Sequence, residues 1–219
     1  HYDTALSPRH RLLAFSDPGG RDVRVVISSR ETGQVIARRL IEGFTALGGV
    51  RCVYSNRRFV VVCEDGGNLF ISSAAEENPD VWSAATDIGN SSGDFDLHYV
   101  DESRFLLAWR DGTAIRATWY AGETSQAVPF GAATALDTSD EAPTGAVAVA
   151  VARNGDVGLI YASAGSTRVR VFGSDGSNVD TATPSAALLA AEATRVAIAA
   201  RWIYADDVVS EALSPFVGY

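Results

Sequence analysis

The stretch Phe105-Leu-Leu-Ala-Trp109-Arg-Asp111 contains a pattern that recurs along this chain of 219 residues. An apolar strand ends in Trp109, and the acidic residue Asp111 follows two positions later. Four other stretches end a strand in an aromatic residue or a cysteine, with an acidic or small polar residue two positions on: Phe15-Ser-Asp17, Cys63-Glu-Asp65, Tyr161-Ala-Ser163 and Tyr204-Ala-Asp206. We call the residue that ends each strand an anchor.

The five anchors are 48, 46, 52 and 43 residues apart, which is close to a regular period. A repeat of this length is typical of a β-propeller, in which each blade is a sheet of four short strands. The sequence therefore predicts an all-β fold, a single propeller domain over residues 1–219 with about five four-stranded blades. The expected blades are roughly 1–43, 44–90, 91–135, 140–185 and 190–219. Part of a larger propeller is the alternative.

Each anchor ends the second strand of its predicted blade. In blade two, the strand Val50–Tyr54 leads through a polar turn to Phe59–Cys63, and the second strand is apolar on both faces. Such strands are expected where a sheet is covered on both sides. Gly-rich turns follow the anchors, as hairpins require. The fifth unit is the weakest: Ala186–Glu192 predicts a helical turn by propensity, with strands from about residue 194 onward.

The composition restricts the classes of function. The chain contains no Met and no Lys, and 18 Arg against 27 acids give a net charge of −9. This charge disfavours nonspecific binding to nucleic acid or to anionic membranes. The longest apolar run, Ala146–Ala152, is too short for membrane insertion. The missing initiator Met favours a processed product or a piece of something longer, such as a subunit of a larger surface assembly.

Cys52 and Cys63 are the two cysteines of the chain. They fall on the two strands of one predicted hairpin and are expected to point from the same face. Because a one-residue change of register decides whether the sulfurs meet, a disulfide and two buried thiols both remain open. The three His residues show no metal-ligand spacing, and the sequence has no P-loop or Gly-x-Ser-x-Gly pattern. We therefore expect no cofactor and no metal.

Two stretches resemble known propellers. The segment Phe105–Asp111 is similar to repeat segments of the extracellular propellers of bacterial surface proteins. The run Leu69-Phe-Ile-Ser-Ser73, followed by Trp82-Ser83 and Ile88-Gly89, resembles the Asp-box segment of sialidase-like propellers, although Ala74–Asn78 stands where that family has the Asp and Gly of its box. Sialidases also use an arginine triad, a Tyr-Glu pair and an Asp, and begin their propeller with Arg-Ile-Pro, which this sequence lacks.

Propeller topology places the turns between first and second strands on one face of the disc, nearest the axis. These turns carry the arginines that we take as candidate ligand-binding residues: Arg11, Arg57, Arg58, Arg104 and Arg153. Guanidinium groups around a propeller mouth suit a carboxylate or a sulfate, because Arg offers paired donors. The alternative is that these arginines are ordinary solvated turn residues. The turns of the opposite face collect acidic residues.

These observations favour a non-enzymatic recognition or structural module, located outside the cell or at its surface, that binds a glycan or a protein through one face. Fold alone does not give function. The resemblance to sialidases keeps a diverged glycoside hydrolase as the alternative. Hydrolysis by a retaining glycosidase needs two carboxyl groups, or a Tyr and its base, beside the scissile bond, and most acids of this chain are expected in turns.

Overall fold

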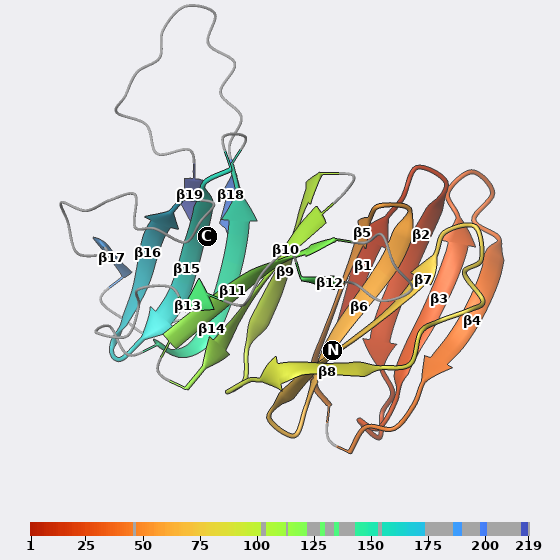
Figure 1. The fold of residues 1–219 in the computed structure, drawn as a ribbon, viewed down its shortest axis with the longest axis horizontal. Helices are drawn as coiled ribbons and strands as arrows, with labels where there is room; N and C mark the ends of the chain where they lie inside the picture. Colours follow the sequence, from red (N-terminus) through yellow and green to blue (C-terminus); the bar gives the residue numbers. More distant parts are fainter. Residues whose placement is uncertain are drawn as a thin grey trace, which may run out of the picture.

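The computed structural model describes residues 1–45, 47–101, 104–112, 114–121, 128–129, 134–135, 143–152, 155–173, 186–189, 198–200 and 216–218. Every regular element of this described part is a β-strand, and the strands form antiparallel sheets in chain order (Figure 1). The predicted all-β fold is therefore confirmed. We call the four larger sheets blades 1 to 4.

Blades 1, 2 and 4 each contain four strands in sequential order, and blade 3 contains five. Blade 1 consists of β1 (Tyr2–Leu6), β2 (His10–Ser16), β3 (Val23–Ser29) and β4 (Val35–Ile41). Blade 2 consists of β5 (Leu47–Ser55), β6 (Arg58–Asp65), β7 (Asn68–Ala75) and β8 (Thr86–Asn90). Blade 3 consists of β9 (Phe95–Asp101), β10 (Arg104–Asp111), β11 (Ala114–Ala121), β12 (Val128–Pro129) and β13 (Thr134–Ala135), the last two both pairing with β11.

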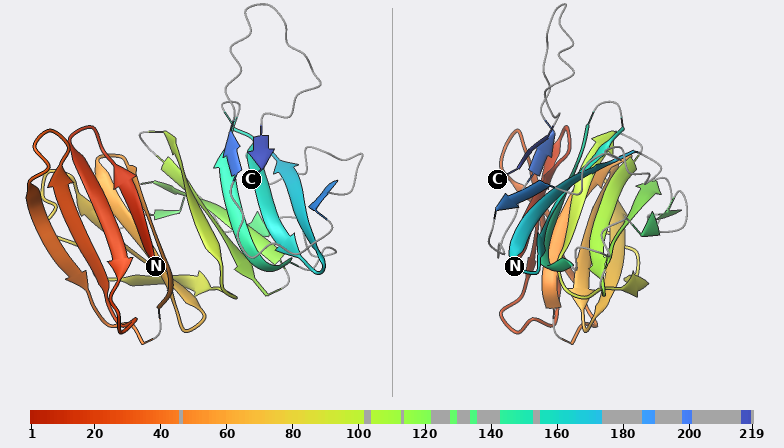
Figure 2. Two further views of the ribbon diagram at one scale, coloured as in Figure 1. Left: turned by 180° about the vertical axis from the view of Figure 1, so that it is seen from behind. Right: turned by 90° about the vertical axis from the view of Figure 1, so that its left-hand side faces the viewer.

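Blade 4 consists of β14 (Pro143–Val151), β15 (Val157–Ser163), β16 (Ser166–Phe172) and β17 (Ala186–Leu189). Two further strands, β18 (Ile198–Ala200) and β19 (Phe216–Gly218), pair with each other. Figures 1 and 2 show the blades side by side in chain order, with β18 and β19 beside blade 4, at the far end from blade 1. We call the first strand of each blade, β1, β5, β9 and β14, its inner strand.

The four anchors that the structure describes lie where the repeat predicts, near the end of the second strand of each blade. Each faces a residue of the inner strand: Phe15 faces Tyr2, Cys63 faces Val50, Trp109 faces Phe95 and Tyr161 faces Val147. The last three anchors are buried. The second strands of blades 2 and 3 are buried on both faces, as in Phe59–Cys63, because a neighbouring blade covers each side.

The core consists of layers between successive blades. We call the face of a blade that carries its anchor the leading face. The leading face of blade 2, with Val50 and Phe59, packs on blade 1, and the leading face of blade 3, with Phe105, packs on the other side of blade 2. Blade 4 packs on blade 3 in the same way through Val147 and Tyr161. The leading face of blade 1 is more open, since Tyr2 is 73% exposed.

Tight hairpins set the register inside the blades. The loop between β5 and β6 is Asn56-Arg57, and both residues have positive φ, 45° and 58°. Two successive residues with positive φ form a type I′ turn, whose twist matches that of paired strands. The loop between β6 and β7, Gly66-Gly67, also has positive φ at both positions. These two hairpins hold the ends of β6, and with them the Cys63 anchor, in a fixed register.

One local expectation is wrong. Ala186–Leu189, where propensity predicts a helical turn, forms strand β17 at the edge of blade 4. The reason is that β16 offers this segment a ladder of backbone hydrogen bonds, with Val169 opposite Ala186 and Thr167 opposite Leu189, and tertiary pairing outweighs a weak local preference. Of the strands expected from residue 194 onward, β18 and β19 are described, and the anchor Tyr204 lies outside the described residues.

Both cysteines are buried free thiols. The register places Cys52 opposite Val61 and Cys63 opposite Val50, so the two thiols lie on the same face but diagonally rather than opposite each other. Burial, followed by the nearby Asp3 carboxylate, raises the pKa of Cys52. Burial likewise raises the pKa of Cys63 to about 12, with a smaller effect of Asp65 and Glu64. Neither thiol is therefore activated as a nucleophile.

Candidate functional site

A cavity in the described part of the chain lies along the inner strands of blades 1 to 3. Its volume is ≈ 1380 Å³, and it is bounded by β1, β5 and β9, by the turns at one end of these strands, and by the β7–β8 connection. This is the end at which the first-to-second turns emerge, nearest the inner strands. Several charged side chains enter the cavity: Asp3, Arg9, Arg30, Arg51, Arg57, Glu76, Glu77 and Asp96.

Three of these charges occupy one repeated position. Asp3, Arg51 and Asp96 each follow the inner-strand residue that faces the anchor of its blade. The Cys52 amide donates to Asp3 Oδ2 at 2.8 Å, and the Val149 amide donates to Asp96 Oδ2 at 3.0 Å. Each carboxylate thus accepts a hydrogen bond from the inner strand of the following blade. These bonds connect blade 1 to blade 2 and blade 3 to blade 4.

Asp96 has the most perturbed carboxylate of the cavity. Burial raises its pKa to about 6, although the Val149 amide and the Arg51 guanidinium act in the opposite direction. Arg51 Nε is 3.7 Å from Asp96 Oδ1, and the Arg51 guanidinium lies 5.9 Å from the centre of the Phe95 ring. Because burial disfavours the charged form, Asp96 holds a proton at a higher pH than an exposed aspartate does.

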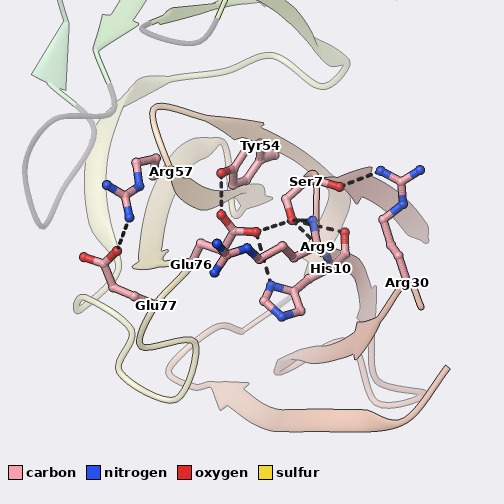
Figure 3. Close-up of polar contacts among 8 residues, drawn as sticks. All are labelled: Ser7, Arg9, His10, Arg30, Tyr54, Arg57, Glu76 and Glu77. Carbon is pink, nitrogen blue, oxygen red and sulfur yellow. Dashed lines mark hydrogen bonds and ion pairs between the residues drawn. The ribbon is translucent and has the colours of Figure 1, made fainter. Parts of the chain in front are cut away.

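A second cluster joins blade 1 to blade 2 at the turns (Figure 3). The Glu76 carboxylate accepts hydrogen bonds from Ser7 Oγ and, at 2.7 Å, from Tyr54 OH, and it lies 3.2 Å from His10 Nδ1. Burial raises the pKa of Glu76, but the hydrogen bonds from Ser7 and Tyr54 and the nearby imidazole outweigh burial and hold it below the usual value. Glu76 is therefore a fixed anion at neutral pH.

This cluster contains Ser, His and Glu but is not arranged as a catalytic triad. A triad needs the imidazole between the hydroxyl and the carboxylate, so that it can remove the hydroxyl proton. Here Ser7 Oγ and His10 Nδ1 both contact the same oxygen of Glu76, and Ser7 Oγ also accepts from the His10 main-chain amide at 2.8 Å. Ser7 is only 2% exposed. The cluster holds the β1–β2 turn of blade 1 against blade 2.

The structure separates the predicted arginines rather than collecting them in one ring. Arg57 lines the cavity and forms an exposed ion pair with Glu77 at 3.0 Å. Arg58 lies beside Ser73, with Nη2 3.3 Å from Oγ, and Arg104 lies 4.9 Å from the centre of the Trp119 ring. Arg11 is exposed on the leading face of blade 1. Arg153 lies outside the described residues.

The structure adds cavity residues that sequence reasoning missed. Glu76 and Glu77 belong to a third-to-fourth turn, which emerges on the same face as the first-to-second turns, so propeller topology alone was sufficient to place them there. Asp3, Arg51 and Asp96 are charged residues on inner strands that are otherwise largely apolar. The sequence feature that could have identified them is their common position, one residue after the inner-strand residue that faces the anchor. Their contacts across 49 or 53 residues were not visible in the sequence.

Within the described part of the chain, no three His, Cys, Asp or Glu side chains come together as metal ligands would. The same residues include no helix of a length and apolarity that would cross a membrane.

No protein-family model matches the chain, and no curated protein matches it by sequence. Several solved structures share its fold. An exo-β-1,3-galactanase from Phanerochaete chrysosporium has a TM-score of 0.52 at 8% identity, over 85% of this chain and 49% of that one. TolB from Acinetobacter baumannii has 0.51 at 16%, over 79% and 40%. The Dos1 propeller has 0.54 at 7%, over 78% and 44%.

The chain spans about half or less of the length of these three proteins. At such low identities the likeness concerns the fold alone, and the three proteins differ in what their names describe. Together with the antiparallel sheets, which follow one another in chain order, the likeness gives the architecture: the chain has a β-propeller fold.

Proposed function

We propose that the protein is a non-enzymatic recognition module that binds a glycan in the cavity of its inner strands. The observation that carries the proposal is that each of the four carboxylates that line the cavity, within the described residues, already has a hydrogen-bond or ion-pair partner. Asp3 and Asp96 accept main-chain amides, Glu76 is held by Ser7 and Tyr54, and Glu77 pairs with Arg57. Asp3, Asp96 and Glu76, engaged in this way, support the walls of the cavity.

The lining of the cavity suits a sugar. Tyr99 is 46% exposed and lines the cavity together with the apolar Leu97 and Val53. Sugar rings present an apolar face of C–H groups and an equatorial set of hydroxyls, so a binding site needs aromatic surface beside hydrogen-bonding groups. Arg9 and Asn56 provide such groups at the rim. A concave site of this kind favours a glycan over a flat protein surface.

A glycan array followed by calorimetry tests the proposal. Binding of an array hit should weaken at least about tenfold in Tyr99→Ala, which removes the exposed ring, a loss of about 1.4 kcal/mol. Arg58→Ala and Arg104→Ala test whether the arginines predicted from the sequence belong to the site. Arg21→Ala, an exposed residue outside the cavity, is the control. Binding that Tyr99→Ala leaves unchanged would count against the cavity as the site.

The second candidate function is a glycoside hydrolase, including the sialidase type that the stretch Leu69–Gly89 resembles. One observation favours it: Asp96 lies in the cavity with a pKa of about 6, and the general acid of a glycosidase has a raised pKa. Turnover of a fluorogenic sialoside or of a nitrophenyl galactoside, lost in Asp96→Asn, would replace the recognition proposal.

We also propose an extracellular or cell-surface location and a place in a larger surface assembly. The resemblance of Phe105–Asp111 to the extracellular repeat propellers of bacterial surface proteins supports the location. Surface labelling of the native cells, with size analysis of the native protein, tests the two together.

A further inference from the structure

Three arginines stand around the rim of the cavity on separate elements of the fold. Arg9 is in the β1–β2 turn, Arg30 directly follows β3, and Arg57 is in the β5–β6 turn. All three side chains are exposed. Figure 3 shows Arg57 on one side of Glu76 and Arg30 on the other side of Ser7, with Arg9 between them. The rim therefore presents positive charge at several points rather than at one.

Backbone and turn contacts fix the positions of two of these arginines relative to each other. The Arg30 amide donates to the carbonyl of Arg9 at 2.9 Å, which ties the β1–β2 turn to the end of β3. Arg30 Nη1 donates to the Ser7 carbonyl at 2.8 Å, so the guanidinium keeps most of its five donors for other partners. The Arg30 charge is thus held by a neutral carbonyl rather than by a carboxylate.

The acidic side chains of the cavity differ in how far they neutralise the positive charge of the rim arginines. The Glu76 side chain is only 13% exposed and its two oxygens are occupied by Ser7, His10 and Tyr54. Glu77 is the acid that competes for the rim, because it pairs with Arg57 at 3.0 Å. Both partners of that pair are mostly exposed, at 78% and 67%, and exposed ion pairs contribute little free energy. An incoming anion can replace Glu77.

We propose that the ligand of the cavity is an acidic oligosaccharide, with a carboxylate or sulfate on more than one sugar, held by Arg9, Arg30 and Arg57. This inference rests on the proposed function. Guanidinium groups bind carboxylate and sulfate through paired, charge-assisted hydrogen bonds. Anions spaced along an oligosaccharide match arginines spaced around a rim, while Tyr99 offers a surface for one sugar ring. A neutral oligosaccharide offers these three arginines no anion.

Calorimetry with the whole chain tests the inference, using trigalacturonic acid, a sulfated disaccharide and neutral galactotriose as probes. The carboxylate and sulfate probes distinguish the two anions. We expect at least one acidic probe to bind at least about tenfold more tightly than galactotriose, and this difference to shrink in 0.5 M salt, because salt screens exposed charges. The Arg9→Gln/Arg30→Gln variant should lose about tenfold in affinity for the acidic probe, and Arg38→Gln, an exposed arginine outside the cavity, should lose none.

Glu77→Gln provides a gain-of-function test. Removing the acid that competes for Arg57 should tighten binding of the acidic probe several-fold relative to binding of galactotriose. Equal affinity for acidic and neutral probes, or unchanged acid binding in both Arg9→Gln/Arg30→Gln and Glu77→Gln, would overturn this inference while the glycan-binding function stands. If none of the probes binds and the array shows no hit, the proposed function itself fails.

Discussion

The Asp96 carboxyl should make the stability of the protein depend on pH in a defined direction. Its folded pKa of about 6 lies above the ordinary value of 3.8. Because the folded state binds this proton more tightly than the unfolded state, the contribution of Asp96 is fully present below the unfolded pKa and is lost as the pH rises through about 6. The difference between the two pKa values corresponds to about 3 kcal/mol in the limit.

Asp96→Asn isolates this contribution. Asparagine does not titrate, and its amide oxygen can still accept the hydrogen bond that the Val149 amide now donates to Asp96 Oδ2. We expect the free energy of unfolding of the variant, relative to the unchanged protein, to rise by about 2 kcal/mol between pH 4 and pH 7. Urea unfolding followed by tryptophan fluorescence measures it, since Trp109 is buried between blades 2 and 3.

Glu31→Gln, at an exposed turn, removes the same unit of charge and reports the effect of net charge alone. The expected quantity is the free energy of unfolding of Asp96→Asn minus that of the unchanged protein. A value that stays constant with pH, or that falls as the pH rises, would refute this role of Asp96. An NMR titration of the Asp96 side chain that gave a pKa near 4 would do so as well.

Three further predictions concern stability and reactivity. Glu76→Gln should lower the free energy of unfolding by about 1–3 kcal/mol in urea, because it weakens the contacts to Ser7, His10 and Tyr54, whereas Glu77→Gln should change it by no more than about 0.5 kcal/mol. The stabilisation by Glu76 should be lost as the pH falls through the lowered pKa of this carboxyl. Equal effects of the two variants would contradict a structural role of the Glu76 contacts. Phe105→Ala should cost about 3–5 kcal/mol, since Phe105 is fully buried and stacks on Tyr120 at 5.3 Å; a loss below about 1 kcal/mol would contradict that packing. Cys52 and Cys63 should react with a thiol reagent at the rate of unfolding, so labelling that is fast in the native state and independent of urea would contradict their burial.

The repeat made the fold predictable, because each of the four described anchors faces the inner strand of its own blade. Trp109 faces Phe95 on the inner strand and contributes to the layer between blades 2 and 3, and Tyr161 does the same between blades 3 and 4. A pattern of this kind depends on pairing inside one blade, which is local in sequence. Ala186–Leu189 was misjudged because its strand depends on the edge of β16, which local propensity does not register.

The site was less predictable, because it is formed by contacts between blades. Arg57 was placed in the first-to-second turn correctly, but its partner Glu77 comes from the other hairpin of the blade. Arg104 was expected at the mouth with Arg57, and instead lies against Trp119 of its own blade. Turn position predicts which end of a blade a side chain occupies. It does not predict whether the side chain turns toward the cavity or back onto the sheet.

The carboxylate contacts between inner strands imply that successive blades resist mechanical force to different degrees. Asp3 ties blade 1 to the backbone of blade 2, and Asp94 and Asp96 tie blade 3 to the backbone of blade 4. Between blades 2 and 3 the matching position holds Arg51, which reaches Asp96 at 3.7 Å. Away from the inner strands, Trp109 Nε1 of blade 3 donates to the Asn90 carbonyl of blade 2 at 2.9 Å. Under a pulling force applied at the two ends, the inner edge of the seam between blades 2 and 3 should therefore part before the inner edges of the other two seams.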